Sequence, residues 1–195
     1  MNTKKPYHKQ IKPTIPKLNT LPNTNKRIPI TPLVNYTTAP PYKLAKYMDH
    51  LIRSNIKLKN HIAIKISIEF IYDIKEKHIS HNATLAPFDL KNLYTNFQTS
   101  ETLQILVNML KQNNIPQSHI DEIINITTIV TQQNNIFNNK YYTQPEGLPM
   151  DSMISSILAE IFIHYIEQTH ILNEQNNKYA HKIIYWYRYV IGYRF

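Results

Sequence analysis

The sequence predicts a mixed α+β fold in which helices pack on a small antiparallel sheet. Helical periodicity recurs in several segments, and extended or turn-rich segments lie between them in an irregular order, which favours α+β. With 42% hydrophobic residues the chain can bury a core, and 195 residues suit one domain with an irregular arm.

The arm is predicted over residues 1–27, and the domain over residues 28–195. The first segment is basic, is interrupted by prolines and has no sustained periodicity, so we expect an extended or polyproline-like conformation. Its cationic side chains could contact phosphates, or the segment could be a solvated tail. They are Lys4, Lys5, Lys9, Lys12, Lys17, Lys26 and Arg27.

The first half of the domain predicts two helices and two extended segments. Residues 28–36 suit a short edge strand or loop, because prolines argue against a central strand. From Pro41 a helical stripe begins, carried by Leu44, Tyr47, Met48, Leu51 and Ile52. A weaker helix is expected over about 64–77, and a strand over 83–90 that ends on Asp89.

The second half predicts three helices, a hairpin and a last strand. One helix begins near Ser100, and another begins at Ser118, whose spacing to Asp121 resembles a capping box. Asn138-Asn139 suits a tight hairpin turn, since asparagine tolerates positive φ. Residues 144–149 form a loop, Asp151 opens a long helix, and a strand is expected over 182–191.

Composition narrows the class of protein. The chain has 22 Lys+Arg and 13 Asp+Glu, a net charge of +9, which indicates a polyanionic partner. It has no cysteine, so disulfides and cysteine metal sites are excluded. Glu160 and His164 interrupt the best apolar run before it reaches the ~18 residues of a membrane span. We therefore expect an intracellular protein without a membrane segment; nucleus and cytoplasm stay open.

Asp89 is the first candidate for chemistry. A carboxylate where a strand gives way to a loop is well placed to hold a divalent cation, although such an aspartate also commonly caps the next turn. Four segments that occur in a particular order along the chain favour the metal-binding alternative for Asp89. They are PLVNYTTAPPYKLAKYMDHLIRS (32–54), FDLKNLYTN (88–96), YYTQPEGLPMDSMISSILAEIF (141–162) and HKIIYWYRYV (181–190).

This set resembles the reverse transcriptases of Penelope-like retroelements, a non-LTR type, over roughly residues 28–191. The resemblance implies a partial right-hand polymerase with fingers and palm but no thumb. It implies an RNA-directed DNA polymerase, a nucleotidyltransferase with Mg²⁺ as cofactor. Its partners would be an RNA template, a DNA primer and a deoxynucleoside triphosphate; the oligomeric state is not implied.

The resemblance also assigns roles to residues. Asp89 matches the catalytic, metal-binding aspartate of the first palm motif, and Leu90 matches its neighbour at the second metal. Tyr94 matches the aromatic gate under the incoming sugar, although a core tyrosine is the alternative. Three further residues match the motif that lines the nucleotide pocket: Gln144, Gly147 and Ser152.

Several positions depart from the family's pattern. The second metal-binding strand ends Tyr-Val-Asp-Asp in the family but carries Ile191-Gly192 here. Two metals ~4 Å apart need carboxylates from two strands, so one aspartate is not enough. At three further positions this chain differs from the family: Thr31 is found where the family has an arginine, Asp151 where it has a glycine, and Met153 where it has a proline. Asp151 could in principle replace the missing metal ligand, but a helix N-cap role is simpler.

The sequence thus predicts a truncated, catalytically inactive reverse transcriptase fragment. Two alternatives stay open: a nucleic-acid-binding remnant without catalysis, and a non-functional truncated product.

Overall fold

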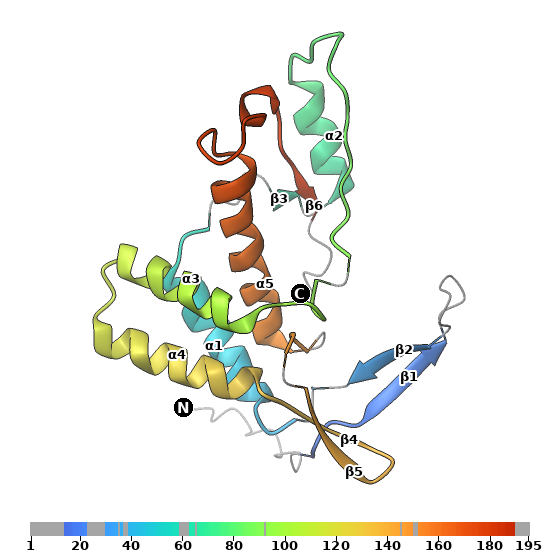
Figure 1. Ribbon diagram of the computed structural model, residues 1–195, viewed down its shortest axis with the longest axis vertical. Coiled ribbons are helices and arrows are strands. Elements are labelled where there is room, and N and C mark those ends of the chain that lie inside the picture. The colour runs from blue at the N-terminus through green and yellow to red at the C-terminus, as the bar shows by residue number, and fades with distance from the viewer. Residues whose placement is uncertain are drawn as a thin grey trace, which may run out of the picture.

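The computed structural model describes most of the chain. The described residues are 14–22, 30–34, 36, 39–58, 63–64, 66–91, 93–144, 146–149 and 152–189. Within them the protein is a mixed α+β fold of five α-helices and three two-stranded sheets (Figure 1). The broad fold class predicted from the sequence is therefore confirmed.

Four helices form the core by packing on one another. They are α1 (Tyr42–Asn55), α3 (Thr99–Gln112), α4 (Gln117–Thr131) and α5 (Met153–Ile166). α5 contacts the other three, and it is apolar on nearly every side, as expected of a helix surrounded by others. Ile154, Ile157, Leu158 and Ile161 are fully buried along it.

These helices were predicted, but the sequence placed their buried faces only approximately. In α1, Met48 and Ile52 are buried as expected, whereas Leu44 and Tyr47 are 40% and 59% exposed. The buried face also takes in Ala45 and Asp49, so it lies one position away from the most apolar stripe. Asp49 on this face accepts a hydrogen bond from Arg53 of the same helix, a polar contact that an apolar pattern does not reveal.

The predicted start of α4 is wrong in detail. Pro116, not Ser118, occupies the N-cap position, and no side chain caps the helix. Asp121 instead accepts a hydrogen bond of 2.7 Å from the Gln117 side-chain amide one turn earlier. Proline is compatible with this place because its missing N–H would have had no helical acceptor.

The hairpin is confirmed. β4 (Gln133–Phe137) pairs antiparallel with β5 (Lys140–Gln144). Asn138 and Asn139 form the turn with φ values of 48° and 59°, the two positive angles that a tight hairpin turn of this hand requires.

A second antiparallel pair joins the predicted arm to the domain. β1 (Leu18–Pro22) pairs with β2 (Ile30–Val34), so the ladder crosses the boundary drawn at residue 27. The Ile136 N–H donates a 2.9 Å hydrogen bond to the Pro16 carbonyl, and this bond ties the start of β1 to β4.

The segment after β2 also contacts β4. The buried Tyr36 hydroxyl donates a hydrogen bond of 3.1 Å to the Asn135 side chain.

The remaining elements lie beside the far end of α5 (Figure 1). α2 (Ser67–Lys75) falls within the predicted 64–77 helix, and it has no buried residue. β3 (Ala63–Ile64) pairs in parallel with β6 (Arg188–Tyr189).

The small antiparallel sheets β1–β2 and β4–β5 do form, but in the described residues the strands predicted over 83–90 and 182–191 build no sheet on which the helices pack. Residues 83–90 have no strand partner there and are exposed throughout. Of the last predicted strand, 182–191, residues 182–189 are described, and within them only the two residues of β6 form a strand. Apolar composition marked both segments as strands, but a strand exists only where another strand offers its hydrogen bonds. No helix of the described chain is long and apolar enough to cross a membrane.

Candidate functional site

The loop that carries Gly147 lies against the segment that carries Tyr94. The Gly147 N–H donates to the Phe97 carbonyl at 3.2 Å, and the Leu148 N–H donates to the Tyr94 carbonyl at 2.8 Å. Phe97 and Leu148 are each only 2% exposed, so apolar burial holds the two backbone segments together. Two of the predicted nucleotide-pocket positions thereby become neighbours.

Glycine is required at position 147. Its φ is +86°, and a Cβ there would lie 2.7 Å from the Tyr94 carbonyl oxygen and 2.9 Å from that of Thr95. It would also lie 2.8 Å from the Gln144 side-chain nitrogen, which donates to the Glu146 carbonyl at 2.7 Å. Tyr94, Gln144 and Gly147 therefore meet at one place, called the Tyr94–Gly147 site below.

Tyr94 contributes its backbone carbonyl to this site, while its side chain is half-buried and packs against the hydrophobic core, as expected of a core tyrosine. Burial raises the pKa of the Tyr94 hydroxyl above the ordinary value. Ser152 is buried as well, at the N-cap position of α5, where its N–H donates to the Pro149 carbonyl at 3.2 Å. No hydrogen bond among the described residues links the Ser152 side chain to the Tyr94–Gly147 site.

Asp89 and Leu90 lie in the exposed segment that precedes Tyr94 in the sequence. The expected strand is absent there, and Leu90 and Phe88 are 60% and 79% exposed. The segment nevertheless meets the aromatic residues near the C-terminus, since the Phe88 and Trp186 rings lie 6.1 Å apart. No three acidic, histidine or cysteine side chains gather as a metal site within the described part of the chain.

The positions that depart from the family's pattern are only partly described. Thr31 lies in β2, and Met153 is the first residue of α5. Asp151, Ile191 and Gly192 lie outside the described residues. The N-cap of α5 is Ser152.

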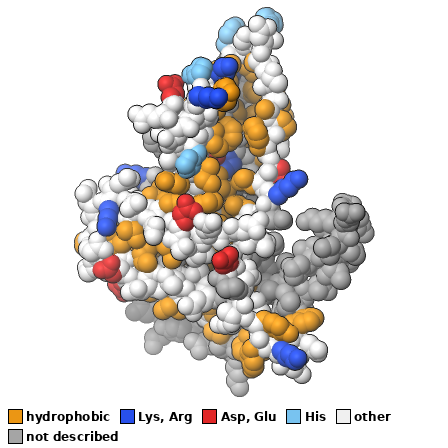
Figure 2. All heavy atoms as spheres, viewed as in Figure 1, with side chains coloured by type: hydrophobic (Ala, Val, Ile, Leu, Met, Phe, Trp, Pro, Cys, Tyr) orange, Lys and Arg blue, Asp and Glu red, His pale blue; other side chains and the backbone are white. Residues whose placement is uncertain are grey.

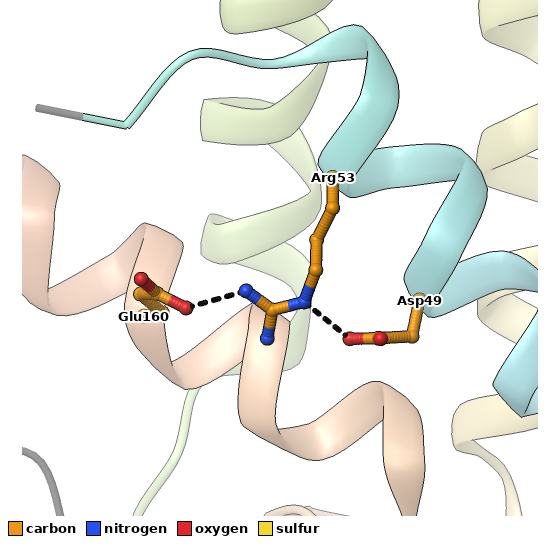
Figure 3. Close-up of polar contacts among 3 residues, drawn as sticks. All are labelled: Asp49, Arg53 and Glu160. Atoms are coloured by element: carbon orange, nitrogen blue, oxygen red, sulfur yellow. Dashed lines mark hydrogen bonds and ion pairs between the residues drawn. The ribbon is translucent and has the colours of Figure 1, made fainter. Parts of the chain in front are cut away.

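A buried charge network was not predicted as such. Arg53 of α1 donates to Asp49 at 3.0 Å and to Glu160 of α5 at 2.9 Å (Figure 3). Both carboxylates are buried, at 6% and 7% exposure. Although burial alone would lower the pKa of Arg53, hydrogen bonds and charge from Glu160 and Asp49 together raise it. A glutamate inside an apolar helical stripe was the available signal.

A second buried acid lies where α5 loosens into a π-helical turn, Glu167–Ile171. Glu167 is 2% exposed; it accepts a 3.1 Å hydrogen bond from the Trp186 indole and lies 3.3 Å from the Arg188 guanidinium. These contacts hold the chain before β6 against α5. π turns are rare, and nothing in the residue pattern predicts this one.

The Asp49–Arg53–Glu160 network and the Glu167 contacts fix helices, whereas the Tyr94–Gly147 site joins two backbone segments at a buried glycine. A search of protein-family models gives no match to this chain, and no curated protein matches it.

Proposed function

We propose that this chain is a fingers–palm fragment of a Penelope-like reverse transcriptase, and that it is inactive as an RNA-directed DNA polymerase. The observation that carries the proposal is the Tyr94–Gly147 site. Its three residues come from two motifs far apart in the sequence, and the resemblance requires those motifs to line one nucleotide pocket. Tyr94 is then the residue placed under the sugar of an incoming nucleotide.

A second contact supports the same proposal. The Phe88–Trp186 contact puts the segment of Asp89 beside the aromatic segment that precedes β6. In the resembling enzymes these two segments carry the metal-binding carboxylates. The proposal places an RNA template and a DNA primer along this side of the protein, with deoxynucleoside triphosphate at the Tyr94–Gly147 site.

The expected inactivity follows from the small number of carboxylates available to bind metal ions. Metal-assisted phosphoryl transfer requires carboxylates that hold two Mg²⁺ ions in register. Asp89 supplies one carboxylate, and Ile191 and Gly192 stand at the positions of the second pair. Mg²⁺ bound at Asp89 would neutralise triphosphate charge, but one carboxylate does not fix two ions.

Nucleotide titration tests the proposed pocket. We expect the chain to bind deoxynucleoside triphosphate more tightly than the ribose form, and Tyr94→Ala to remove that preference. Gln144→Leu should weaken both affinities, whereas Gln132→Leu, at the exposed C-cap of α4, should leave them unchanged. Isothermal calorimetry measures each affinity. Equal binding of both sugars by the natural chain would contradict the pocket.

Primer extension tests the expected inactivity separately. The purified chain, an RNA template with a DNA primer, and Mg²⁺ should give no extended product. Extension that Asp89→Ala abolishes would overturn the claim of inactivity while leaving the family proposal intact.

A further inference from the structure

Exposed tyrosines and lysines occur in the segment that leads from α5 back to β6 and at the end of α2, elements that lie near one another in the ribbon (Figure 1). Tyr179 is 54% exposed and Tyr185 is 40% exposed. Three lysines accompany them: Lys77, Lys178 and Lys182. These five residues are called the lysine–tyrosine face.

Each tyrosine ring of the face has an ammonium group close to it. The Lys178 and Lys182 amines lie 4.9 Å and 5.4 Å from the centre of the Tyr179 ring. The Lys77 amine lies 5.1 Å from the centre of the Tyr185 ring. Contacts of this kind at exposed sites are weak, so the lysines can leave the rings when a stronger anionic partner arrives.

The backbone holds Tyr179 in place before any ligand binds. Its N–H donates to the Asn177 side chain at 3.0 Å, and the Asn177 amide donates to the Ile171 carbonyl at 2.8 Å. The Lys182 N–H closes a turn on the Tyr179 carbonyl at 2.9 Å, and the buried Ala180 anchors that turn. The backbone that carries the ring is therefore ordered beforehand and loses little conformational entropy on binding.

The charge of the face is only partly neutralised. The Lys77 amine forms an ion pair with a carboxylate oxygen of Asp73, 3.7 Å away. Neither Lys178 nor Lys182 forms an ion pair with any described residue. Two ammonium groups therefore flank one exposed, positioned aromatic ring. An acidic peptide would satisfy the lysines but would leave the ring without a stacking partner.

We infer that the lysine–tyrosine face binds single-stranded nucleic acid, with an unpaired base stacked on Tyr179 and the adjoining phosphates bound by Lys178 and Lys182. Sequence-independent binding of single strands combines these two elements, a cationic track and exposed aromatic rings. A duplex is excluded as the preferred ligand because its bases are already stacked on one another.

The face is distinct from the Tyr94–Gly147 site and does not depend on the proposed ancestry. Primer extension and nucleotide titration can therefore both fail while the face still binds a strand. The reverse outcome is equally readable, because the variants below change no residue of the nucleotide site.

The test measures anisotropy of a short fluorescein-labelled oligodeoxythymidylate bound by the full chain, over a series of salt concentrations. Tyr179→Leu should weaken binding about tenfold, the loss expected for one stacked base, and Tyr179→Phe should retain it. Replacing both Lys178 and Lys182 with Gln should lower the slope of log affinity against log salt by about 1.4, since each phosphate contact contributes ~0.7.

Matched controls come from the tip of the β4–β5 hairpin, where Lys140 precedes a 73% exposed Tyr141. Lys140→Gln and Tyr141→Leu should leave affinity and salt slope unchanged. Equal losses in these controls, or an unchanged affinity for Tyr179→Leu, would overturn the inference. So would polyglutamate that competes as well as the oligonucleotide, since the partner would then be an acidic protein segment.

Discussion

Single buried polar residues decide much of the behaviour of this chain. Tyr36, Asp49, Glu160 and Glu167 are all buried, and each meets a polar partner far away in the sequence or one helical turn away. A buried polar group without a partner would lower the free energy of unfolding by about 1–3 kcal/mol, so the folded state depends on these contacts being made. Gly147 acts in the opposite way, through a side chain that must be absent.

Tyr36 should make the protein sensitive to alkali. Burial raises its pKa to about 12, an effect that the hydrogen bond to Asn135 only partly opposes. Because the unfolded tyrosine ionises near pH 10, the free energy of unfolding should fall as pH rises from about 10 to about 12. The loss attributable to Tyr36 is about 2 kcal/mol.

Denaturant unfolding at several pH values measures this effect. The Tyr36→Phe protein should lose less unfolding free energy than the natural chain as the pH rises. Near neutral pH it should be about 1 kcal/mol less stable, because the Asn135 side chain loses its hydrogen-bond donor. Curves for the two proteins that stay parallel up to pH 12 would contradict the assignment.

At the scale of elements, local pattern predicted what local interactions determine. The helices were found from the 3.6-residue period, and the hairpin from Asn138-Asn139, whose positive φ values are a property of the turn itself. The two missing strands are different, because their existence depends on distant partners. Residues 83–90 and 182–191 are apolar enough for strands, yet the described chain gives the first no partner and the second only two residues of β3.

The candidate site divides along the same line. Tyr94, Gln144 and Gly147 could be grouped from motif order, and the structure does bring them together. The Asp49–Arg53–Glu160 network could be inferred only in part. The i, i+4 spacing of Asp49 and Arg53 suits a pair on one helix, but the contact with Glu160 on α5 and the burial of both carboxylates do not follow from spacing. Only the charged position within an apolar stripe indicated that Glu160 needs a partner.

Removal of Arg53 should loosen α1 from α5. Arg53→Met would leave two buried carboxylates without their cation, and we expect a loss of about 2 kcal/mol, moderated because the arginine side chain is 30% exposed. Glu160→Gln keeps an acceptor and should cost less.

Urea denaturation of the two single variants and the double variant gives the coupling energy. A matched variant, Lys57→Met, changes an exposed cation just beyond the same helix and should be nearly neutral. If the Arg53 and Lys57 variants lose the same stability, the network does not couple the helices.

At the scale of the whole molecule, stability is distributed unevenly. The four-helix core contains almost all fully buried side chains, while α2 and residues 83–90 expose large apolar ones. Figure 2 shows hydrophobic side chains gathered on the upper part of one face, beyond the helical core. Leu85 and Phe88 are about four-fifths exposed at 81% and 79%, and so much exposed apolar surface favours association.

Amide hydrogen exchange should divide the molecule in the same way. We expect the amides of α2, which has no buried residue, to exchange much faster than those of α3, which has four. Mass spectrometry of peptic fragments measures both helices in one experiment. Similar protection in α2 and α3 would show that the face over α2 is covered in solution.

The pairing of β1 with β2 has a consequence for how the basic arm can be studied. β1 shields an edge of β2 that would otherwise present unpaired backbone groups to other molecules. A deletion of residues 1–27 would thus remove positive charge and also expose the edge of β2, whose unpaired backbone groups could pair with other chains. Weaker nucleic-acid binding by such a deletion could not be attributed to its lysines. Charge-neutralising substitutions that leave the strand intact separate the two effects.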